Sequence, residues 1–141
     1  MSEGRYAAGS RPRFGIRFVG GGDPGRDMRD LLDGEMLRVS ARLGDRDRPV
    51  PGELVLALRA EEPVLWRSYK RGADPEPLMP PLRIAENSRP RGRLAVVLGK
   101  LAWRVLDVRT GAGNKLTVVV PTLDAALVHR AFEEAGRPEW W

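Results

Sequence analysis

Short apolar runs, separated by glycine, proline and charged residues, fill the sequence from position 35 onward. The first of them, 35–43, has an apolar residue at every second position from Leu37 to Leu43, with mostly polar residues between. This two-residue period is typical of a strand with one buried face. We expect seven strands in all: EMLRVSARL (35–43), ELVLALRA (53–60), PVLWRS (63–68), LRIAE (82–86), LAVVL (94–98), WRVLDVR (103–109) and KLTVVV (115–120).

Two segments between these runs are predicted to be connections because of their composition. GDRDRPVPG, 44–52, is rich in residues that favour turns. RGADPEPLMPP, 71–81, contains four prolines. Proline has no backbone N–H to donate to a neighbouring strand, so we do not expect this second segment to join the sheet.

A different period marks the C-terminal segment. Pro121 ends the last strand, Thr122 can cap a helix, and Asp124 suits the first helical turn. The apolar residues that follow recur at the spacing of one helical face: Leu123, Leu127, Val128, Ala131, Phe132 and Ala135. We therefore expect an amphipathic helix over 122–135, closed by the glycine and proline that come after it.

The N-terminal part is predicted to hold less structure. Residues 1–13 are polar and aperiodic, as in a flexible arm, and FGIRFV, 14–19, is a short candidate strand. Asp23 and Pro24 suit the start of a helix that ends near Gly34. The expected organisation is an arm (1–13), a strand and short helix (14–34), a β domain with its C-terminal helix (35–136) and a tail (137–141).

This order of elements predicts a mainly β fold. A small barrel or sandwich has an open end, and a helix with one apolar stripe can cover it. We therefore expect a small, seven-stranded barrel or sandwich like that of pleckstrin-homology (PH) domains, with a C-terminal capping helix.

Residues 66–134 also resemble an uncharacterised actinobacterial family whose soluble part is PH-like. The matching features are Trp66-Arg67 in a strand, the turn RPRG at 89–92, the apolar run LAVVL, Ala126-Leu127 early in the last helix, and Phe132 near its end. The resemblance implies a PH-like fold but no activity, because the family has none assigned. Members of that family begin with a transmembrane helix, and no apolar run here is long enough for one, so membrane attachment does not carry over.

Two glycine-rich stretches raise the question of nucleotide binding. Gly20, Gly22 and Gly25 fit G-x-G-x-x-G, but a dinucleotide fold needs helices between its strands, and the later sequence is strand after strand. RTGAGNK, 109–115, departs from the phosphate-loop spacing and is followed by three valines, which favour a strand over a helix. We interpret the first stretch as the approach to a helix and the second as a hairpin turn, whose Gly111, Gly113 and Asn114 tolerate positive φ.

The amino-acid composition argues against several kinds of metal and catalytic site. The 141 residues include no cysteine and one histidine, His129, so there is no thiolate metal site and no histidine cluster. We read His129 as a surface or boundary residue. The neighbouring carboxylates Glu61-Glu62 and Glu133-Glu134 point apart on a strand or helix, so they do not form an acid–base pair. We expect no cofactor, no metal and no enzymatic activity.

The charge is unevenly distributed, and this provides the main functional signal. Residues 82–115 contain eight basic and two acidic residues, a net charge of +6, while the whole chain carries +5. A local positive field suits a phosphate group or an acidic protein surface. The candidate anion- or partner-binding residues are Arg67, Lys70, Arg71, Arg89, Arg91 and Arg93, with Arg46 and Arg48 as possible additions.

The sequence leaves the partner open. An acidic protein or assembly partner is the preferred expectation, with an anionic lipid headgroup or a nucleic acid as alternatives. RPRGR, 89–93, resembles the core of a minor-groove-binding AT-hook. A structural subunit that assembles through the N-terminal arm, a strand edge and Trp140-Trp141 is a further alternative, as is a solvated basic face without a ligand. Since no secretory signal or membrane span is evident, we expect a cytoplasmic location, with the inner membrane surface as a peripheral site.

Overall fold

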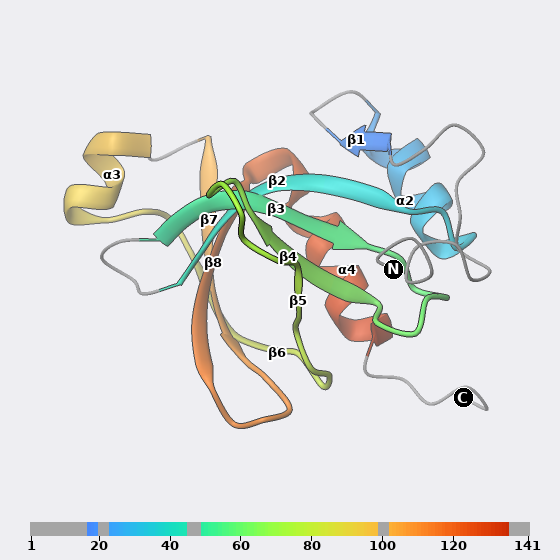
Figure 1. Ribbon diagram of the computed structural model, residues 1–141. Coiled ribbons are helices and arrows are strands. Elements are labelled where there is room, and N and C mark those ends of the chain that lie inside the picture. The colour runs from blue at the N-terminus through green and yellow to red at the C-terminus, as the bar shows by residue number, and fades with distance from the viewer. Residues whose placement is uncertain (1–16, 20–22, 45–48, 99–101, 136–141) are drawn as a thin grey trace.

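The computed structural model describes residues 17–19, 23–44, 49–98 and 102–135. This part of the chain is mostly strands, with three α-helices and one 3₁₀ turn between or after them (Figure 1). The elements are β1 (Arg17–Val19), α2 (Pro24–Leu32), β2 (Leu37–Gly44), β3 (Pro49–Leu56), β4 (Val64–Ser68), β5 (Glu76–Pro77), β6 (Arg83–Ser88), α3 (Gly92–Leu98), β7 (Trp103–Arg109), β8 (Lys115–Pro121), η1 (Thr122–Asp124) and α4 (Ala125–Ala135).

Seven of the strands form one antiparallel sheet in the order β5-β4-β3-β2-β8-β7-β6. β2 has different neighbours along its length: Leu37–Val39 pair with β1 in parallel, and Arg42–Gly44 pair with β8. The fold is thus mainly β and of the small barrel or sandwich type. The predicted C-terminal helix is also confirmed, as η1 followed by α4.

The core lies between the sheet and the helices. As predicted, β2 buries every second residue, including Leu37 and Val39. α4 packs against β4 and β6 and against α2. It contributes Phe132 to the core, and α2 contributes Leu31. Asp23 caps α2 by accepting a hydrogen bond from the Arg26 N–H at 3.1 Å, so the predicted start of that helix is confirmed.

The prediction of a strand at LAVVL was wrong, because these residues belong to α3. β6 and β7 already pair with each other, up to Ser88 opposite Val105. The chain between them therefore has no strand beside it to complete its hydrogen bonds, and it satisfies them locally as a helix. α3 stands away from the sheet (Figure 1), and its Val96 is 86% exposed.

The expectation that the proline-rich segment stays out of the sheet was also wrong. Glu76–Pro77 forms the two-residue strand β5, paired with Leu65 and Trp66 of β4. β5 is the end of the sheet order, and at a sheet edge the missing N–H of a proline can face away from the neighbouring strand. The expected seven strands of the β domain are present, but β5 takes the place of LAVVL.

Two leucines of the helical segments are exposed, and one of them, Leu123, was predicted to lie on the apolar face of the C-terminal helix. Leu123 is 62% exposed, because it belongs to the 3₁₀ turn η1, whose residues do not continue the face of α4. Leu32, at the end of α2, is 41% exposed, while Asp27 of the same helix is buried. The remaining predicted face of α4 packs into the core.

The β7–β8 hairpin confirms that RTGAGNK is a turn. Arg109 pairs with Lys115, and the Thr110 N–H donates to the Asn114 carbonyl at 3.0 Å. Gly113 has φ +85°, the left-handed conformation that glycine adopts without strain. Gly111 has another reason to be glycine, because a β-carbon there would overlap the Pro80 carbonyl. Gly20 and Gly22 of the other motif lie outside the described residues.

Candidate anion-binding site

The predicted basic residues are spread over three parts of the fold. Arg67 lies on β4, and Lys70 and Arg71 are exposed in the connection from β4 to β5. Arg89 and Arg91 lie between β6 and α3, and Arg93 is exposed on α3. Arg46 and Arg48 lie outside the described residues.

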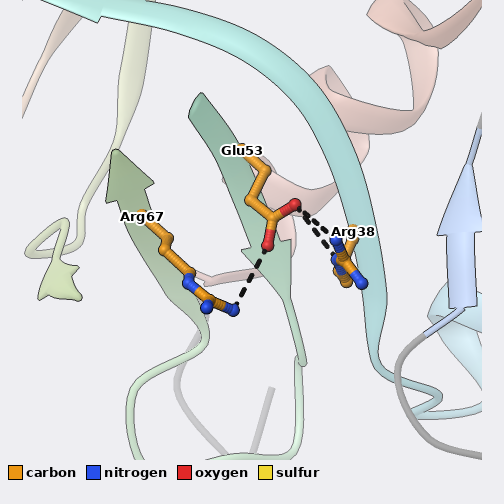
Figure 2. Close-up of polar contacts among 3 residues, drawn as sticks. All are labelled: Arg38, Glu53 and Arg67. Carbon is orange, nitrogen blue, oxygen red and sulfur yellow. Dashed lines mark hydrogen bonds and ion pairs between the residues drawn. The ribbon is translucent and has the colours of Figure 1, made fainter. Parts of the chain in front are cut away.

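Arg67 is part of a charged cluster with Glu53 and Arg38 (Figure 2). Glu53, on β3, lies directly opposite Arg67 of β4, and its carboxylate is only 1% exposed. The Arg38 Nε and Nη2 atoms donate to the Glu53 Oε2 atom at 3.0 and 2.9 Å. The Arg67 Nη1 atom is 3.7 Å from Oε1. Both arginines therefore stabilise a buried negative charge.

This cluster was not predicted from the sequence, because Glu53 stood at the start of the predicted strand 53–60, where a charged side chain is commonly exposed. On the same face of β3 and β4 lie Val55 and Leu65, which belong to a second small buried cluster. In the structure both faces of β3 are covered, since its residues from Gly52 to Leu56 are all buried. A carboxylate in such a strand requires a cationic partner.

Arg89 and Arg91 line a surface hollow of about 520 Å³, which we call the basic hollow. Its lining residues are Ser88, Arg89, Pro90, Arg91, Gly92 and Arg104. Three of these six residues are arginines, and none is acidic. Guanidinium groups bind carboxylates and phosphates through paired, charge-assisted hydrogen bonds, so the hollow suits an anionic group.

Arg104, which was not predicted as a site residue, is the best-positioned of the three arginines. It lies on β7, and its Nε atom donates to the Asn87 Oδ1 atom at 2.7 Å. Its Nη2 atom donates to the Asn87 carbonyl at 3.2 Å. Asn87 lies on the neighbouring strand β6, so the pairing of β6 with β7 places this guanidinium beside Arg89 and Arg91. The spacing of these arginines in the sequence does not show that they are neighbours, because their proximity depends on how β6 and β7 pair.

A second hollow, of about 670 Å³, adjoins the basic hollow and shares Arg104 with it. We call it the helix hollow, because most of its wall comes from α2, η1 and α4. It is lined by Met28, Asn87, Arg104, Thr122, Ala125, Ala126, His129, Arg130 and Glu133. His129 is exposed, as predicted, and its Nδ1 atom lies 3.4 Å from the Glu133 Oε1 atom. The helix hollow therefore mixes charges of both signs with apolar surface.

A third hollow, of about 470 Å³, lies at the other end of the β6–β7–β8 ladder. Its wall combines Glu86 and Asp107 with Arg109 and Lys115. Asp107 lies opposite Thr117, whose hydroxyl is 3.5 Å from the Asp107 Oδ1 atom. The charges of this wall balance in sign, so it offers an anion no advantage.

Two buried carboxylates, Asp27 of α2 and Asp124 of η1, are separate from these hollows. They are 4% and 3% exposed. Burial raises the pKa of Asp124 above its ordinary value, and the negative charge of Asp27 raises it further. Neither residue lines a hollow described above, so we treat them as part of the packing of α2 against the C-terminal helix.

Comparisons with known proteins add no relative, since no protein-family model matches the chain and no curated protein matches it. Within the described ranges, no three His, Cys, Asp or Glu side chains gather where they could hold a metal ion. The same part of the chain contains no helix of the length and apolar character needed to cross a membrane.

Proposed function

We propose that this protein is a non-enzymatic, PH-like binding module that docks an anionic group of an acidic protein or phosphate-bearing ligand in its basic hollow. The observation that carries the proposal is the gathering of Arg89, Arg91 and Arg104 around one hollow without an acidic lining residue. Its volume lies within the range of about 300–1,000 Å³ that is usual for ligand sites. The seven-stranded antiparallel order with a C-terminal helix supports the PH-like assignment.

The β4–β5 connection is a weaker candidate for the same role. Lys70 and Arg71 are exposed there, but neither lines the basic hollow. Arg67 already interacts with Glu53. We therefore assign the main anion contact to Arg89, Arg91 and Arg104, and treat Lys70 and Arg71 as an additional positive field.

A nucleic acid is the second candidate ligand, favoured by the net charge of +6 over residues 82–115. The AT-hook comparison gives it less support than the sequence suggested. An AT-hook enters the minor groove with an extended R-G-R segment, whereas Gly92 and Arg93 begin α3. A duplex would therefore have to bind through phosphate contacts alone, with strong dependence on salt.

Titration with inorganic pyrophosphate and free phosphoserine, followed by NMR of the arginine side chains, tests the proposal. We expect the Arg89, Arg91 and Arg104 signals to shift together, and Arg91→Ala to weaken binding about tenfold, the loss of one charge-assisted hydrogen bond. Arg83→Ala is the matched control, because Arg83 is exposed on β6 and does not line the hollow.

Two results would count against the basic hollow. Equal loss of affinity in Arg83→Ala and Arg91→Ala would mean that only net charge matters. Loss of affinity in a Lys70→Ala/Arg71→Ala variant, with Arg91→Ala unaffected, would move the site to the β4–β5 connection. Duplex and single-stranded DNA at two salt concentrations test the second candidate.

A further inference from the structure

The basic hollow and the helix hollow adjoin each other, and this arrangement indicates what kind of anionic ligand the protein takes. Arg104 lines both, and the consecutive residues Asn87 and Ser88 line one each. The two hollows therefore follow one another over the surface, from the β6–α3 segment to the outer side of α4. A ligand that filled both would have to be elongated.

The linings differ in chemistry, so the two ends of such a ligand must differ as well. The basic hollow has three arginines and no carboxylate. The helix hollow has apolar surface from Met28, Ala125 and Ala126, and its charged residues are of both signs: Arg104, Arg130 and Glu133. One end of the ligand must carry negative charge, and the other must be uncharged and partly apolar.

We propose that the two hollows together form a docking groove for an extended peptide segment of a partner protein. One anionic side chain, phosphoserine or glutamate, occupies the basic hollow, and the uncharged, apolar residues beside it occupy the helix hollow. This inference rests on the proposed function of the basic hollow and adds the class of partner.

The charge of the helix hollow favours a peptide over a nucleic acid. A polynucleotide carries a negative charge on every nucleotide, so a strand that continued from the basic hollow would bring phosphates towards Glu133. The positive charge of Arg130, in the same wall, is 3.7 Å from the carboxylate of Glu134 and is partly offset by it. A peptide can place a single charge beside the arginines and apolar side chains against the alanines of α4.

Fluorescence anisotropy with labelled pentapeptides tests the groove. The probes are phosphoSer-Ala-Leu-Ala-Leu, the same peptide with Glu first, and the same peptide with unmodified Ser first. Free phosphoserine competes with them. We expect the phosphoserine peptide to bind at least about tenfold more tightly than free phosphoserine, because its leucines bury apolar surface. The unmodified peptide should bind at least about tenfold more weakly than the charged ones.

Ala126→Gln separates the inference from the proposed function. Ala126 is exposed and lines only the helix hollow of the two, so the larger side chain narrows that hollow without adding charge. We expect it to weaken peptide binding about tenfold and leave free phosphoserine unaffected, whereas Arg91→Ala weakens both. Ala73→Gln, at an exposed alanine of the β4–β5 connection, is the matched control and should change neither.

The remaining outcomes decide against the groove. If phosphoserine binds but the peptide binds no more tightly, or Ala126→Gln leaves peptide affinity unchanged, the groove is wrong and the proposed function stands. If phosphoserine itself does not bind, both fail. If a single-stranded oligonucleotide displaces the phosphoserine peptide at lower concentration than the unlabelled peptide does, the partner is a nucleic acid.

Discussion

The carboxylate of Glu53 is almost completely buried. A buried charge without a partner costs several kcal/mol, so Arg38 and Arg67 are required by the strand that carries Glu53 rather than by a ligand. The two arginines differ in geometry: Arg38 is 33% exposed and donates two close hydrogen bonds, while Arg67 is 55% exposed and lies 3.7 Å away. The alternation along β2 predicted which residues face the core, but the burial of Glu53 depends on what packs over the other face.

Arg38→Met should therefore destabilise the protein by about 3 kcal/mol, because it leaves the Glu53 carboxylate buried and poorly paired. Arg67→Met should cost no more than about 1 kcal/mol, as an exposed ion pair does. Urea unfolding measures both. The double variant Glu53→Met/Arg38→Met should recover much of the loss, since no uncompensated charge remains. Equal losses in the two single variants would show that the two arginines contribute alike.

At the scale of elements, the longer strands and the helices α2 and α4 followed from the sequence pattern, while α3 and β5 did not. LAVVL has strand-like composition, but the pairing of β6 with β7 leaves it no partner strand. Glu76–Pro77 has little strand propensity, but β4 lies beside it. In both cases the presence or absence of a neighbouring strand determines the secondary structure of the segment. Which elements become neighbours cannot be predicted from one sequence.

The tip of the β7–β8 hairpin contacts the segment that follows β5: the Gly111 N–H donates to the Met79 carbonyl at 2.8 Å. Gly111→Asn should destabilise the protein by about 1–3 kcal/mol, because its β-carbon would overlap the Pro80 backbone. Gly113→Asn should cost less than Gly111→Asn, because nothing lies within 4 Å of a β-carbon there and only the positive φ, which asparagine tolerates better than most residues, opposes the change. Thermal unfolding of both variants measures this, and the opposite order would contradict the contact.

The packing of α2 against the C-terminal helix makes stability depend on pH through Asp124. Its pKa is raised in the folded state, so the folded protein binds a proton more tightly than the unfolded chain does. Stability from this group is therefore greatest at low pH and falls as pH rises from 3.8, its ordinary value, through the raised value.

Asp124→Asn removes that charge and should be more stable than the parent protein near neutral pH, with the advantage vanishing as the pH falls towards 3.8. Urea unfolding at a series of pH values measures the difference between the two proteins. Asp33→Asn, at an exposed position after α2, is the control. An advantage for Asp124→Asn that stayed constant down to acidic pH would mean that the substitution acts through packing and not through charge.

At the scale of the whole molecule, the sequence located the positive charge but not its arrangement. The excess over residues 82–115 predicted that Arg89 and Arg91 belong to a basic surface. It did not identify Arg104 as their neighbour, because only the β6–β7 register places β7 beside the end of β6. The helix hollow could not be predicted from the sequence either, because its wall combines Met28 of α2 with residues of η1 and α4 about a hundred positions later.

The net charge of +5 also predicts how binding responds to salt. Raising NaCl from about 0.1 M to 1 M shortens the Debye length from about 10 Å to 3 Å, which removes attraction from distant charges but not from arginines in contact. The phosphoserine peptide should therefore lose affinity modestly, with its association rate falling more than its dissociation rate rises. Stopped-flow measurements test this, and a change confined to dissociation would contradict it.

Arg104 also has a thermodynamic consequence. Its guanidinium is held by Asn87 and forms part of both hollows. A group in the basic hollow that draws the guanidinium away from Asn87 alters the wall of the helix hollow at the same time. The two halves of a ligand would then contribute to affinity non-additively, and by linkage each half would change the binding free energy of the other by the same amount. One shared side chain would in this way make binding in the two hollows cooperative.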